Sequence, residues 1–107
     1  MKSLAAFKRR LEVGKKLHTI HHGYGKETDQ EVDLGIREIS IVQSNSFALK
    51  TKRVGGEEVD SWLEYPKAAD CKFPDENTIE IWEPAYNNEE NHHWTGTFKS
   101  LTYKFID

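Results

Sequence analysis

Four runs of β-branched and aromatic residues constrain most strongly what this chain can fold into. They are "IREISIVQSNSFALKTKRV" (36–54), "VDSWLEYP" (59–66), "TIEIWEP" (78–84) and "TFKSLTYKFI" (97–106), and Gly-Gly, Pro and Asn-Asn signals divide them. Short runs of this kind between turn residues are typical of β-strands. We therefore predict a mainly β fold, α+β at the margin: a small SH3-like barrel or a strongly bent antiparallel sheet of five to six strands.

One helix is predicted before these strands, over about residues 3–13. Leu4, Phe7 and Leu11 form an apolar stripe at helical spacing, with Ser3 as the N-cap and Gly14 as the stop. The run 15–22 fits either a helix or a strand, and 23–35 has the composition of a polar loop. We predict a single domain over residues 1–107, with the β-rich body at about 36–107.

The Gly55-Gly56 pair predicts a hairpin, and its register decides which side chains face the core. A two-residue loop would mix charged and apolar side chains on both faces. A three-residue loop through Glu57 gives one face a consistent character, pairing Phe47 with Tyr65, Leu49 with Leu63 and Thr51 with Ser61. We prefer the second register, which pairs Lys50 with Trp62 on the opposite face.

Two tryptophans are thus predicted on faces turned away from the strand core. Trp62 is placed there by the hairpin, and Trp82 by its alternation with Ile79 and Ile81. Exposed, they could stack on nucleic-acid bases. We favour the other interpretation, in which the apolar stripe of the helix packs over them, because two exposed tryptophans are unusual on a small soluble domain.

The formal net charge of −3 hides an uneven distribution. Residues 1–26 carry seven Lys or Arg against one Glu, whereas 57–90 carry eleven Asp or Glu against two Lys. The basic start makes nucleic-acid binding a rival function, although carboxylates near the tryptophans would repel phosphate. The candidate macromolecule-binding residues are Lys8, Arg9, Arg10, Lys15, Lys16, Trp62 and Trp82.

The histidines in "HTIHHG" (18–23) and "NHHW" (91–94) raise the question of a metal site. His18 and His22 share a face on either a helix or a strand, and further ligands would have to come from His92 or His93. This spacing matches no zinc signature, so we predict no metal site. We also expect no cofactor and no enzymatic activity, because the chain contains no nucleophile, phosphate-loop or acid–base motif.

The lone Cys71 cannot form an internal disulfide or a CxxC motif, and we expect a small buried thiol. The N-terminal segment has no hydrophobic signal region and no span long enough for a membrane. We expect a cytoplasmic protein with no membrane partner.

The runs "SNSFAL" (44–49), "SWLEYPKA" (61–68) and a closing "F…TIEIWE" (73–83) resemble small uncharacterised proteins of bacterial phages and conjugative or other mobile elements. The resemblance covers about residues 37–83 and implies a genomic setting and a small β domain. We therefore expect a non-catalytic accessory protein of a mobile element that binds another macromolecule, namely a protein. The alternatives are a nucleic-acid-binding small β-barrel and an acidic inhibitor of a host nucleic-acid enzyme.

Overall fold

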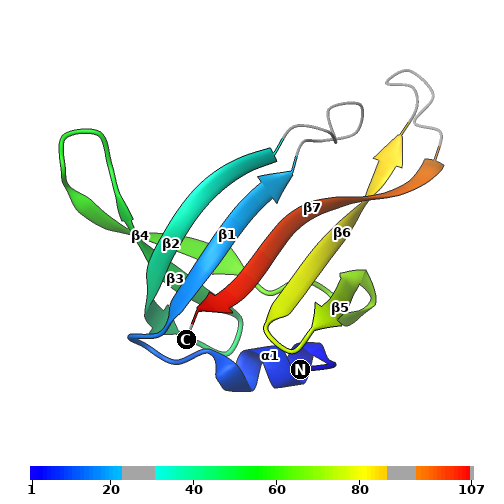
Figure 1. Cartoon of the computed structure of the whole chain (residues 1–107), viewed down its shortest axis with the longest axis horizontal. Helices are drawn as coiled ribbons and strands as arrows, with labels where there is room; N and C mark the ends of the chain where they lie inside the picture. Colours follow the sequence, from blue (N-terminus) through cyan, green and yellow to red (C-terminus); the bar gives the residue numbers. More distant parts are fainter. Residues whose placement is uncertain (23–30, 87–93, 107) are drawn as a thin grey trace.

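A single curved antiparallel sheet makes up most of the molecule (Figure 1). The computed structural model describes residues 1–22, 31–86 and 94–106. In this part of the chain the sheet has seven strands in the order β4-β3-β2-β1-β7-β6-β5. Their bounds are β1 Lys16–His22, β2 Glu31–Val42, β3 Ser46–Lys52, β4 Glu58–Glu64, β5 Cys71–Asp75, β6 Thr78–Tyr86 and β7 Trp94–Ile106.

The prediction of a mainly β fold built on a strongly bent antiparallel sheet is confirmed. The sheet has edges at β4 and β5, so it is not closed into a barrel. The strand count exceeds the predicted five to six because residues 16–22 and 71–75 also form strands. One short 3-10 turn, η2 (Ala68–Asp70), precedes β5.

The β-rich part begins earlier than predicted, at Lys16. The ambiguous run is strand β1, which pairs with β2 on one side and with β7 on the other. Glu31 to Gly35, predicted to lie in a polar loop, extend β2, because their backbone pairs with the end of β1. Residues 23–30 of the predicted loop lie outside the described residues. Pairing with distant strands here outweighs the weak local strand preference.

The predicted N-terminal helix is α1 (Leu4–Arg10), and Ser3 caps it as expected. The Ala6 backbone N–H donates to Ser3 Oγ at 3.1 Å. The helix ends at Arg10 rather than near Gly14, because Leu11 adopts an extended conformation. The Gly14 N–H donates to the Ile39 carbonyl at 2.9 Å, which fixes the connection from α1 to the sheet.

The core lies between α1 and the inner, concave face of the sheet. Phe7 is fully buried, and its ring contacts Phe47, Tyr103 and Phe105 at centroid distances of 6.2, 6.1 and 5.7 Å. The helix therefore covers the face that carries Phe47. The other buried members of this cluster are Leu11, Leu17, Ile39, Leu49, Ile79 and Ile81.

The prediction that α1 covers the tryptophan face is wrong for Trp62. Strand alternation places Trp62 on the face of β4 opposite to Leu63, which packs against the core cluster. The apolar stripe of α1 packs on the inner face because that face presents several aromatic and aliphatic side chains to it. Trp62 is left 50% exposed.

The β3–β4 hairpin has a three-residue loop, as predicted, but one residue earlier in the chain. Phe47 pairs with Leu63 and Leu49 with Ser61, so the pairing differs from the prediction by two residues. The loop is 54–56, with Gly56 at φ 88° in the left-handed region. A three-residue hairpin loop needs such a residue at its third position, which suits glycine and not Glu57. A shift of two keeps every side chain on its predicted face.

Candidate binding surface

The outer face of β4 is exposed along its whole length. Its four outward side chains are all exposed, and they are Glu58, Asp60, Trp62 and Glu64. The strand register places Trp62 across from Ala48 and places Asp60 across from Lys50. A half-exposed tryptophan set among charged side chains on a strand is a typical anchor for a macromolecular contact.

The charges around Trp62 are more acidic than basic. Lys50 Nζ lies 2.7 Å from Glu38 Oε2 of β2, and that hydrogen bond and charge raise the pKa of Lys50. Glu58 and Asp60 raise the pKa of Lys50 further. Phosphate groups approaching Trp62 would therefore meet carboxylates whose charges Lys50 and Lys52 only partly offset.

Three of the five candidate basic residues, Lys8, Arg10 and Lys15, already contact other groups of the protein. Lys8 Nζ lies 4.5 Å from the centroid of the Tyr65 ring, and Lys15 forms an exposed ion pair with Glu12 at 3.7 Å. Lys8 and Arg9 lie on α1, on the opposite side of the sheet from the outer face of β4. The structure therefore does not bring the basic helix and Trp62 onto one surface.

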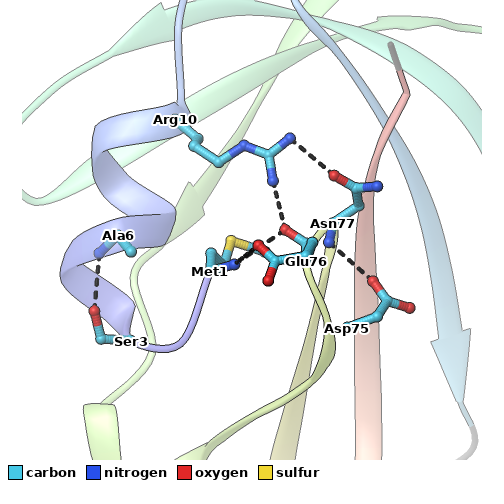
Figure 2. A network of polar contacts seen from close by, with 7 residues as sticks. All are labelled: Met1, Ser3, Ala6, Arg10, Asp75, Glu76 and Asn77. Atoms are coloured by element: carbon cyan, nitrogen blue, oxygen red, sulfur yellow. Dashed lines mark hydrogen bonds and ion pairs between the residues drawn. The ribbon is translucent and has the colours of Figure 1, made fainter.

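Arg10 is the most strongly engaged of these residues (Figure 2). Its guanidinium donates to the Glu76 carbonyl at 2.6 Å and to Asn77 Oδ1 at 3.1 Å, and it lies 4.3 Å from the Phe105 ring centroid. The Met1 amino group also contacts Glu76, at 3.0 Å from Oε2. Arg10 thus ties α1 to the β5–β6 turn, which makes it a structural residue.

Lys16 lies elsewhere, beside a cleft between β2 and β3. These strands pair only from Ile39 and Leu49 to Val42 and Phe47, and toward the tip of the hairpin they separate. Figure 1 shows the β3–β4 hairpin projecting away from the rest of the sheet there. The cleft has a volume of about 670 Å³ and is lined by Lys16, Leu34, Ile36, Arg37, Glu38, Lys50, Thr51, Lys52 and Glu58.

Trp82 is partly buried and already has partners. Lys72 Nζ lies 3.8 Å from the centroid of its ring, and its indole N–H donates to Glu80 Oε1 at 3.4 Å. Lys99 Nζ contacts the other oxygen of the same carboxylate at 3.4 Å. A ring held in this way is less available for base stacking than Trp62.

His18 and His22 share a face of β1, as predicted, and each contacts a carboxylate of β2. His18 Nε2 lies 2.7 Å from Asp33 Oδ1, and His22 Nδ1 lies 3.3 Å from Glu31 Oε1. Within the described ranges, no group of three or more His, Cys, Asp or Glu is placed to hold a metal. His92 and His93, the proposed further ligands, lie outside those ranges, so the absence of a metal site stays a prediction.

His22 differs from His18 in being buried. Its Nε2 forms a hydrogen bond with Thr102 Oγ1 at 3.0 Å, and the residue is 4% exposed. Burial lowers the pKa of His22, and the positive charge of Lys99 adds to this effect. The carboxylates of Glu31 and Glu80 act in the opposite direction but more weakly.

Cys71 has the environment of an unreactive thiol. It is partly buried, and its Sγ donates to the Lys67 carbonyl at 3.4 Å. Burial raises the pKa of the thiol, and the neighbouring Asp70 raises it further. The thiolate that a catalytic cysteine needs is therefore disfavoured here.

Comparison of the chain with family models, with curated proteins and with solved structures gives no match. The described part of the chain contains no helix that combines the length and the apolar character needed to cross a membrane.

Proposed function

We propose that this chain is a non-catalytic binding protein that contacts a partner protein through the outer face of the β3–β4 hairpin. The observation that carries the proposal is the 50% exposure of Trp62, next to Leu63, which packs against the core from the opposite face of the strand. Tryptophan is enriched among the residues that dominate protein interfaces, because it buries a large area at a small entropic cost.

The charge around Trp62 favours a protein over a nucleic acid. Glu58, Asp60 and Glu64 share its face of β4 and would repel a phosphate backbone. They would instead complement Lys and Arg side chains at the rim of a protein interface. The partner we infer has an apolar pocket for Trp62 bordered by basic groups.

The acidic side chains on the outer face of β4 also support a more specific function, with a more closely defined partner. Alternate outward positions of a strand lie roughly 7 Å apart, so Glu58 and Asp60 form a short regular row of negative charge. A basic nucleic-acid-binding groove is one protein surface that such a row fits. Together with the resemblance to mobile-element proteins, this favours a host enzyme acting on nucleic acids as one candidate partner.

The experiment is photo-crosslinking in the native host from single positions of the hairpin. A crosslinking amino acid at Glu64, on the outer face, is expected to capture one protein. The same group at Val54, fully exposed at the hairpin tip, serves as the matched control and is expected to capture none. Capture of nucleic acid from position 64 would contradict the proposal and favour the nucleic-acid rival.

The captured protein is then purified and its affinity measured directly. Trp62→Ala is expected to weaken binding about 30-fold or more, which corresponds to about 2 kcal/mol for an interface anchor. Val54→Ala is expected to leave the affinity unchanged. Equal affinities for wild type and Trp62→Ala, with both proteins folded, would place the interface elsewhere.

A further inference from the structure

The cleft between β2 and β3 contains a cation that lacks a charged partner. The Nη1 of Arg37 donates to Thr51 Oγ1 at 3.0 Å, and its Nε is buried with no hydrogen-bond partner among the described residues. Within the same part of the chain, no carboxylate lies within ion-pair distance of this guanidinium. Arg37 therefore carries its charge into a partly dehydrated site whose nearby groups, the Thr51 hydroxyl and the Tyr103 phenol, are neutral.

The Thr51 hydroxyl, which faces Arg37, already forms all the hydrogen bonds that a hydroxyl can form. Thr51 Oγ1 accepts from Arg37 and from Ser61 Oγ, the latter at 2.8 Å, and it donates to the Leu49 carbonyl at 3.5 Å. Removing a guanidinium from water without a counter-charge costs free energy. Consistent with this, burial lowers the pKa of Arg37. An incoming oxyanion would supply the missing counter-charge.

The rest of the cleft adds positive charge. Its lining contains Lys16, Lys50 and Lys52 besides Arg37, against the carboxylates of Glu38 and Glu58. Glu38 is paired with Lys50 at 2.7 Å, which leaves a positive surplus.

We propose that this cleft binds a small molecule that carries a carboxylate or phosphate group, with the acid on the Arg37 guanidinium. The volume of about 670 Å³ falls within the range of small-molecule sites. The guanidinium geometry suits bidentate contact with either oxyanion. The cleft borders the proposed protein interface, because Glu58 belongs to both, but the acid site depends on Arg37 and not on Trp62.

The test is an NMR titration of the full chain that follows the Nε–Hε signals of its arginines. Inorganic phosphate, phenyl phosphate and benzoate are the probes, and sodium chloride at matched ionic strength is the control. We expect the Arg37 signal to shift saturably, whereas that of Arg10, held by Glu76 and Asn77, stays in place. Of phenyl phosphate and benzoate, the probe that binds with the lower Kd identifies the acid that the site prefers.

Two variants separate binding at Arg37 from a general charge effect. Arg37→Met is expected to weaken the affinity for the tighter-binding probe about tenfold or more, because the charged guanidinium donor is lost. Arg53→Met removes the same charge from an exposed position and is expected to leave the affinity unchanged. Shifts that are linear in probe concentration, that sodium chloride reproduces, or that are equally weakened in both variants would overturn the proposal. The wild-type titration decides the question even if Arg37→Met fails to fold.

Discussion

The two faces of the β3–β4 hairpin show how one short segment can serve stability and recognition separately. On the inner face, Phe47 and Leu49 are fully buried, and the Phe47 ring contacts Phe7 of α1. On the outer face, Trp62 is half exposed among carboxylates. Because successive side chains of a strand point in opposite directions, substitutions on the two faces can have independent effects. The core is expected to tolerate little change, and the outer face a great deal.

The largest effect is expected at the centre of the inner face. Phe7→Ala removes a fully buried ring that contacts three other aromatic rings, and it should lower the free energy of unfolding by about 3–5 kcal/mol. A domain of this size has only about 5–15 kcal/mol of stability, so the variant is expected to be partly unfolded. Chemical denaturation followed by tryptophan fluorescence measures the loss. A change below about 1 kcal/mol would show that α1 does not close the core.

A smaller effect is expected for the contact that fastens α1 to the sheet. Arg10→Ala removes two hydrogen bonds and a contact with the Phe105 ring, and it should cost about 1–2 kcal/mol. Arg9→Ala, at the exposed neighbouring position, removes the same charge and should cost less than about 0.5 kcal/mol. Thermal denaturation of the two variants side by side measures the difference. Equal losses would mean that helix charge, and not the contact with Glu76 and Asn77, stabilises this end.

These two arginines also illustrate what the sequence predicts well and what it does not. The helix itself and its Ser3 cap follow from local spacing, and both are confirmed. Of the predicted stripe, Phe7 and Leu11 are buried, although Leu11 lies just past the end of the helix. Which face of the sheet the stripe covers depends on how distant strands assemble, and there the prediction was wrong. The sequence does not distinguish Arg10 from Arg9, because the β5–β6 turn that binds Arg10 is about 66 residues away.

The strands show the same division between local and distant information. Alternation along 59–65 and 78–82 predicted which residues face inward, and the structure agrees at Leu63, Ile79 and Ile81. The position of the loop could have been predicted as well. The third residue of such a loop has a left-handed conformation, which suits Gly56, whereas the predicted loop placed Glu57 there. The separation of β2 from β3, and with it the Arg37 cleft, follows from where the pairing ends, and no local pattern marks that point.

The smallest expected effect concerns a titratable side chain that is buried on the outer face of the sheet. Alternation along β1 puts His22 on the same face as His18, yet His22 is 4% exposed. Burial and the charge of Lys99 lower its pKa below the ordinary value of 6.5, against the opposing effect of Glu31 and Glu80. His21, the adjacent histidine, lowers it slightly further. His22 is therefore expected to be neutral in the folded protein near pH 7.

The sign of the resulting pH dependence follows from proton binding. Between the lowered pKa of the folded state and 6.5, the unfolded chain binds more protons than the folded one, so stability decreases as the pH falls through this window. Urea denaturation at several pH values between 7 and 5 measures the slope. His22→Gln should flatten it, and Glu31→Gln should steepen it by removing a charge that raises the pKa. A wild-type slope of the opposite sign, reversed by Glu31→Gln, would mean that the ion pair with Glu31 outweighs burial at His22, and that the outer face is hydrated there as it is around Trp62.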